Sequence, residues 1–180
     1  MKLHAVAAFA VLWFAAGALG GCDNPKPRQV PPDPMAAPPP PVVVPPPKDG
    51  MSAGLPKLPQ MAPFTPDRIG AAQDPLNRQP AATSAAEPIL IDGFAFDPAA
   101  RLPAKGVDVV IDGKAYGTVY GAPRQDVSAY FKAPALEPSG FTMTLPAATL
   151  AKGPHALVLR VIATDGTGYF ESPRIAFQVN

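Results

Sequence analysis

Side chains that commonly perform chemistry in proteins are scarce in this chain of 180 residues. It has one cysteine, Cys22, and two histidines, of which His4 lies just before an N-terminal apolar run and His155 lies near the C-terminus. A zinc-type site needs three or four Cys, His or carboxylate ligands, and a Ser-His-Asp triad would have to use His155. Because His155 follows a Gly-Pro pair and precedes an apolar run, we expect it to lie at a strand edge or at a corner between strands. We therefore predict no metal site and no cofactor.

Paired carboxylates could supply the acid and base of a glycosidase. The C-terminal half offers these candidates: Asp92, Asp97, Asp108, Asp112, Asp126, Asp165 and Glu171. Asp112 and Asp165 belong to Asp-Gly turns, and Asp97 belongs to an Asp-Pro turn. The spaced Asp/Asn ladder of a calcium loop and a glycine-rich phosphate loop are both absent from the sequence. We predict that the protein is not an enzyme and has no catalytic residues.

Residues 1–21 have the anatomy of a secretory signal peptide. Lys2 provides the positive start, an apolar run begins at Ala5, and small residues close the run at Gly17, Ala18, Gly20 and Gly21. A transmembrane anchor is the alternative reading. The uncharged stretch 5–21 has 17 residues, slightly fewer than the ~18–20 that span a bilayer, and no basic cluster follows it. We expect residues 1–21 to be cleaved.

The next motif, Leu19-Gly20-Gly21-Cys22, resembles the lipobox of bacterial lipoproteins. The resemblance implies that the Cys22 sulfur receives a diacylglycerol, that the chain is cut before Cys22, and that the new amino terminus is acylated, typically with palmitate. Two or three acyl chains anchor a protein almost permanently, whereas one holds it only marginally. The resemblance thus places the protein in the bacterial cell envelope as a lipid-anchored partner of the membrane. It leaves open the periplasm-facing leaflets of the inner and outer membranes, and the cell surface.

Residues 22–88 read as a proline-rich tether. Residues 23–88 hold 19 of the chain's 27 prolines, and no period of 3.6 or 2 is visible in them. Proline blocks helix interiors and sheet ladders, and proline-rich runs favour extended polyproline II. We expect a lipidated, disordered tether. It serves either as a spacer or as a docking strip for a proline-binding module.

Residues 89–180 have the pattern of short β-strands. Residues 107–111 alternate polar and apolar residues, and Asp112-Gly113 predicts a hairpin to a second strand over 114–120. Further strands are expected over 89–96, 141–145, 157–162 and 175–179, with Gly93 as a candidate bulge. Six or seven short strands without a long helical pattern predict an all-β sandwich.

Three segments carry a resemblance: "IDGFAFDP", "VDVVIDGKAYGTVYG" and "LAKGPHALVLRVIATDGTGYF". They are similar to the repeated Ig-like domains of bacterial exported proteins. The resemblance implies an Ig-like β-sandwich over 89–180, serving as a spacer, adhesion or ligand-binding module, and it carries no catalytic residues. We expect this domain to be monomeric.

The insertion 121–140 is long for a sandwich loop and supplies the candidate binding residues. With the preceding strand it presents Tyr120, Arg124, Asp126 and Tyr130. In one reading Arg124 pairs with Asp126, or Asp126 caps a short helix ending at Phe131, and the aromatic residues cover the core. In the other reading the same clamp supports a binding face.

Charge narrows the class of partner. The formal net charge is +1, and without residues 1–21 the chain has 14 basic and 14 acidic side chains. No basic stripe remains to attract nucleic acid. We predict a non-catalytic envelope lipoprotein that presents an Ig-like binding or structural domain to an unknown envelope protein or glycan. The alternatives are an accessory subunit of an envelope polysaccharide enzyme and a carbohydrate-binding module, although Trp13, the sole Trp, lies in the signal segment.

Overall fold

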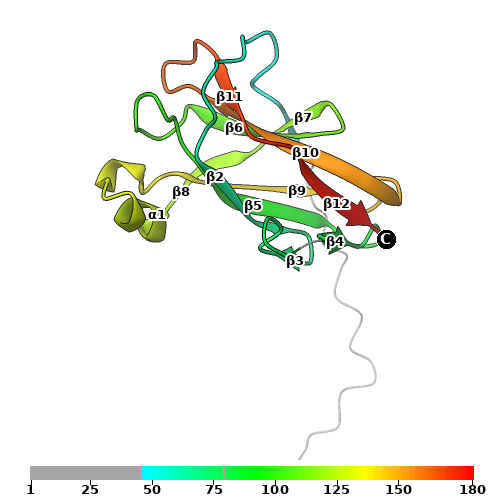
Figure 1. Ribbon diagram of the computed structural model, residues 1–180. Coiled ribbons are helices and arrows are strands. Elements are labelled where there is room, and N and C mark those ends of the chain that lie inside the picture. The colour runs from blue at the N-terminus through cyan, green and yellow to red at the C-terminus, as the bar shows by residue number, and fades with distance from the viewer. Residues whose placement is uncertain (1–45, 79) are drawn as a thin grey trace, which may run out of the picture. The chain divides into compact units, whose positions relative to one another are not determined.

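The computed structural model describes residues 46–78 and 80–180, which form two β-sheets packed as a sandwich (Figure 1). Two short helical segments, α1 (Gln125–Tyr130) and the 3₁₀ helix η1 (Pro134–Leu136), interrupt the strands. The predicted all-β, Ig-like sandwich is confirmed as a two-sheet fold. Within the described ranges, no helix has the length and apolarity needed to cross a membrane.

The larger sheet runs in the order β1–β7–β6–β10–β12–β4, and β11 also pairs with β10. All its pairings are antiparallel except that of β12 with β4. Its strands are β1 (Lys48–Asp49), β4 (Ala82–Thr83), β6 (Gly106–Ile111), β7 (Lys114–Gly117), β10 (Gly153–Ile162), β11 (Tyr169–Glu171) and β12 (Ile175–Val179). The strand predicted over 157–162 therefore lies at the centre of this sheet.

The smaller sheet runs in the order β3–β2–β5–β9–β8 and is entirely antiparallel. Its strands are β2 (Phe64–Ile69), β3 (Ala72–Gln73), β5 (Ile89–Ala95), β8 (Val119–Ala122) and β9 (Gly140–Leu145). Along β5 the side chains alternate between buried and partly exposed, which is the burial pattern of a strand with one face on the core.

The core lies between the inner faces of the two sheets. Its fully buried side chains come from alternate positions on facing strands, so the two sets interdigitate. The largest of them are Phe141, Ile69, Ile89, Ile91, Ile111, Leu145, Leu157 and Leu159. The apolar alternation in the sequence predicted most of these positions.

The Asp112-Gly113 hairpin is confirmed, but its second arm is not a single strand. Asp112 and Gly113 have φ angles of 49° and 88°, as the primed turns of tight hairpins require. After β7 the chain crosses to the other sheet at Thr118, whose backbone N–H and Oγ1 both donate to the carbonyl of Val107. The strand expected over 114–120 is therefore divided between two sheets.

The predicted tether over 22–88 is wrong for its second part. Residues 48–88 contain β1 to β4, and Ala62, Ile69 and Ala81 are buried in the core. Residues 22–45 lie outside the described residues. The prediction failed because proline and loop residues separate these strands, so no regular period marks them. Pro66 even lies within β2.

A polar network holds the segment before β2 on the outer face of the larger sheet. The buried carboxylate of Asp108 accepts hydrogen bonds from the backbone N–H groups of Met51 and Ser52, at 2.9 and 2.6 Å. Glu171 accepts one from Lys57 at 2.7 Å and one from Arg160 at 3.1 Å. Because two carboxylates on the sheet bind this segment, it belongs to the folded domain.

A β-bulge in β2 shapes one end of the smaller sheet. Pro66 pairs with Gly93 and Arg68 pairs with Asp92, so Asp67 is the extra residue. A Cβ atom at Gly93 would lie 2.1 Å from the carbonyl oxygen of Thr65, and only glycine allows this approach. The bulge expected at Gly93 on β5 therefore lies on the neighbouring strand, β2, and Gly93 leaves the space that the bulge needs.

We predict that residues 46–180 fold cooperatively and that residues 89–180 alone do not. The shorter fragment lacks β2, which pairs along β5, and it lacks the buried side chains of Ala62, Ile69 and Ala81. Thermal unfolding followed by near-UV circular dichroism should show a sharp transition for the longer fragment. A transition of equal sharpness and temperature in residues 89–180 would contradict the role assigned to β2.

Candidate functional site

The insertion 121–140 folds into α1 and η1, which lie beside β8 at one end of the sandwich (Figure 1). These segments bury a small apolar cluster of their own, separate from the main core. It consists of Phe96, Val127 and Leu136, with Phe94, Phe131 and Ala133 packed against it. The insertion is therefore a packed part of the domain, anchored to the end of β5.

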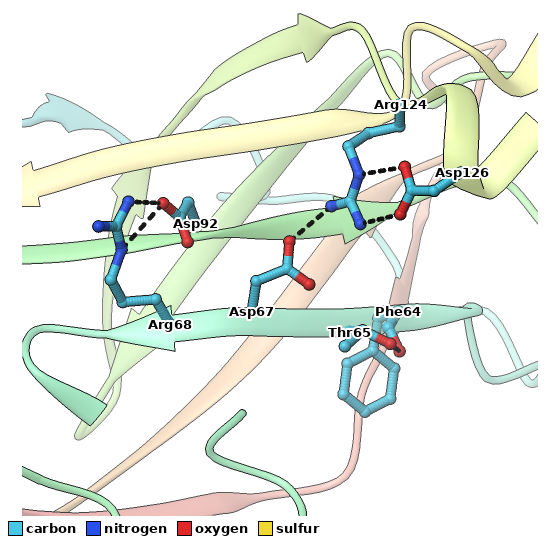
Figure 2. Close-up of polar contacts among 7 residues, drawn as sticks. All are labelled: Phe64, Thr65, Asp67, Arg68, Asp92, Arg124 and Asp126. Carbon is cyan, nitrogen blue, oxygen red and sulfur yellow. Dashed lines mark hydrogen bonds and ion pairs between the residues drawn. The ribbon is translucent and has the colours of Figure 1, made fainter. Parts of the chain in front are cut away.

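Arg124 joins this insertion to β2. Its Nε and Nη2 atoms donate to the two carboxylate oxygens of Asp126 at 2.9 and 2.7 Å, and its Nη1 donates to Asp67 at 2.7 Å (Figure 2). The guanidinium also lies over the ring of Phe94, 5.1 Å from its centroid. The Arg124–Asp126 clamp, which is common to both expected interpretations of the insertion, is therefore observed, with Asp67 as an added partner.

The capping reading of Asp126 is wrong. The residue at the N-cap of α1 is Arg124, and no side chain caps the helix. Asp126 lies within the first turn of α1, where both of its oxygens are directed to the guanidinium. The bidentate pair with Arg124 is therefore the main interaction of this carboxylate.

The two carboxylates around Arg124 have opposite pKa shifts. The hydrogen bonds from Arg124 lower the pKa of Asp126 to about 2. At Asp67, burial raises the pKa above its ordinary value, although Arg124 acts in the opposite direction. Both partners raise the pKa of Arg124, the Asp126 hydrogen bond being the larger cause. The cluster therefore holds a permanent cation between two acceptors.

Beside this cluster lies a pocket of about 480 Å³. The ring of Phe131 stands at 69° to that of Phe94 and at 79° to that of Tyr130, with centroid distances of 6.4 and 5.0 Å. Tyr130 is 81% exposed, so its ring forms an outer wall. The lining residues are Pro63, Phe64, Thr65, Phe94, Asp126, Val127, Tyr130 and Phe131.

Tyr120, a fourth predicted binding residue, makes hydrogen bonds inside the domain. Its hydroxyl donates to the carbonyl of Ala95 at 2.8 Å and accepts from the N–H of Ala104 at 2.9 Å. Burial raises its pKa to about 12. Both hydrogen bonds are internal, and Tyr120 does not line the pocket.

The structure thus brings together three of the predicted binding residues, Arg124, Asp126 and Tyr130, and Cys22 lies outside the described residues. Sequence reasoning missed Asp67 and Phe94 as partners of Arg124. Asp67 was missed because it was assigned to the tether. The alternation along its strand places Phe94 on the outward face of the sheet. No feature of the sequence indicates that this face contacts Arg124, about 30 residues later.

The other candidate chemical groups have structural partners. His155 lies between two acceptors, with Nδ1 2.5 Å from Asp112 and Nε2 2.7 Å from the carbonyl of Ala151. The hydrogen bonds to Asp112 and Ala151 raise the pKa of His155, and a protonated ring satisfies both. Asp97 is buried, and burial by itself would raise the pKa of its carboxyl group. Hydrogen bonds from Thr164, Ala100 and Ala99 have the larger combined effect and hold this pKa below its ordinary value.

Comparisons with known proteins leave the function open. No family model matches the chain, and no curated protein matches it. Among solved structures, CopC from Methylosinus trichosporium OB3b is similar, with 18% sequence identity and a TM-score of 0.35. The match covers 63% of this chain and 92% of that one.

Among the described residues, no group of three or more His, Cys, Asp or Glu side chains is placed to hold a metal ion.

We predict that Asp126→Ala lowers the stability of the domain at neutral pH. Asp126 is exposed and Arg124 keeps Asp67, so the loss should be about 1 kcal/mol, or roughly 3 °C in melting temperature. Because the folded pKa of Asp126 is about 2, below its ordinary 3.8, the contribution is complete above about pH 4 and disappears as the pH falls through about 2.

Thermal melts of wild type and Asp126→Ala at neutral and acidic pH measure this effect. Glu87→Ala, which removes an exposed carboxylate elsewhere, is the matched control. A difference between wild type and Asp126→Ala that stays constant down to about pH 2 would rule out the ion pair as its cause.

Proposed function

We propose that this chain is a non-catalytic, lipid-anchored protein of the bacterial envelope whose β-sandwich presents a recognition pocket. The observation that carries the proposal is the pocket formed by Phe94, Tyr130 and Phe131 beside the Arg124 clamp. Mostly apolar concave surfaces with a few fixed polar groups are typical of ligand sites. The clamp fixes the backbone on which Tyr130 is exposed, so the wall of the pocket is preorganised.

The lipid anchor is supported by the sequence around Cys22. The motif Leu19-Gly20-Gly21-Cys22 follows an apolar run, and Cys22 is the one thiol of the chain. An exported protein with an unpaired thiol would be open to oxidation, and acylation removes that thiol. The anchor would hold the domain at a periplasm-facing leaflet or at the cell surface.

A carbohydrate-binding module is the second candidate, and one observation favours it. The ring of Tyr130 is 81% exposed, and the Asp126 carboxylate lies in the same pocket. An exposed aromatic ring with a nearby carboxylate can stack on a sugar and accept hydrogen bonds from its hydroxyl groups. Residues 22–180 contain no Trp, but the exposed Tyr130 ring still offers an aromatic surface on which a sugar can stack.

Replacement of Cys22 tests the anchor. We expect Cys22→Ala to abolish incorporation of labelled palmitate and to move the protein out of the membrane fraction, or to leave residues 1–21 uncleaved. Mass spectrometry of the amino terminus and cell fractionation measure both. A Cys22→Ala protein that is cleaved and still bound to the membrane would show that Cys22 is not the anchor.

Replacement of Tyr130 tests the pocket. We expect Tyr130→Ala to reduce crosslinking of the full chain to its envelope ligand without changing the melting temperature, because the side chain is 81% exposed. Leu102→Ala, at another exposed apolar residue, is the control and should crosslink as wild type does. Equal crosslinking by Tyr130→Ala and wild type would place any binding surface elsewhere.

A further inference from the structure

The shape, charge and hydrogen-bonding capacity of the pocket define a class of ligand. We propose that the pocket beside α1 binds a quaternary ammonium group, such as the trimethylammonium of choline. This inference rests on the proposed function, because it names the ligand class of the same pocket.

The rings form a corner rather than a flat platform. Phe131 stands steeply against both Phe94 and Tyr130, at 69° and 79°. A sugar ring stacks through one broad face of C–H groups and fits one flat aromatic surface best, whereas a compact, rounded group contacts two or more walls of a corner. A trimethylammonium group has this compact shape, and aromatic corners are its usual binding sites.

The charge around the pocket favours a cation. Asp67 and Asp126 both bind Arg124, so two carboxylates surround one guanidinium and one negative charge is in excess. The side chain of Asp126 is 66% exposed, whereas that of Arg124 is 18% exposed. A ligand in the pocket therefore faces the carboxylate.

The lining of the pocket favours a cation without N–H donors. A guanidinium brings five N–H donors and a primary ammonium brings three, and both oxygens of Asp126 already accept from Arg124. Apart from Asp126, the lining side chains are mostly apolar, and the side-chain acceptors among them are the hydroxyls of Thr65 and Tyr130. Donors that find no acceptor are costly to bury. A quaternary ammonium has no N–H donor, and its methyl groups contact the apolar lining.

Choline and its neutral isostere 3,3-dimethylbutan-1-ol provide the test. The full chain, in a detergent without choline headgroups, is titrated with each compound while NMR shifts of the insertion 121–140 are followed. We expect choline to bind tighter than the isostere by roughly two- to fivefold, the value of an exposed cation–π contact. If the two compounds bind equally well, the pocket does not recognise the positive charge and the proposal is overturned. The proposal is also overturned if neither compound binds.

Variants locate the site. Tyr130→Leu should weaken choline binding by roughly two- to fivefold, Tyr130→Phe should restore it because the ring is kept, and Leu102→Ala should bind as wild type does. Unchanged binding by Tyr130→Leu, or shifts caused by neutral oligosaccharides and not by choline, would overturn the proposal. If phosphatidylcholine vesicles displace free choline, the group comes from a lipid headgroup; if they do not, a soluble choline compound supplies it.

Failure here is separable from failure of the proposed function. If choline does not bind, yet Tyr130→Ala still loses its crosslinked envelope ligand, the recognition pocket stands and its ligand belongs to another class. If Tyr130→Ala crosslinks as wild type does and choline does not bind, both proposals fall.

Discussion

The guanidinium of Arg124 connects parts of the chain that no local interaction could hold together. It reaches from the start of α1 to Asp67 on β2, 57 residues earlier, and lies over Phe94 on β5. An insertion of this length loses considerable conformational entropy when it becomes ordered. The bidentate pair with Asp126 fixes the direction of the guanidinium, and the contact with Asp67 then fixes the insertion against the sheet. The position of the pocket depends on this arrangement.

Features with local signals could be predicted from the sequence. The alternation of Phe141, Met143 and Leu145 marked a strand with one buried face, and Asp112-Gly113 marked a hairpin through its turn chemistry. The Arg124–Asp126 pair was also accessible, because its two members lie two residues apart and have opposite charges. In each case the residues that carry the signal lie close together in the sequence.

Features that depend on distant partners could not be predicted. Pro66 argues against a strand, and β2 tolerates it because Gly93 leaves room for the bulge opposite. The segment before β2 is ordered by Asp108, whose partners lie 56 and 57 residues away. The crossing at Thr118 likewise needs the carbonyl of Val107 on β6. The composition shows that residues 46–88 are rich in proline. It does not show the residues elsewhere in the chain that this segment contacts and that hold it in the fold.

The Arg124 side chain is largely buried, whereas its two carboxylate partners are exposed. This difference explains how a pocket can form at this end of the sandwich without destabilising the domain. A guanidinium is more weakly hydrated than an ammonium, so it can be partly buried at lower cost, while Asp67 and Asp126 keep 45% and 66% of their side chains exposed. The carboxylates that hold the insertion are therefore exposed to solvent, and Asp126 also lines the pocket. The apolar support comes from Val127 of α1 and Leu136 of η1, both of which are buried. Tyr130 belongs to neither the ion pairs nor the buried cluster. Replacing it should therefore leave the clamp and the cluster intact, and in the proposed function its exposed ring is the part of the pocket that sets ligand specificity.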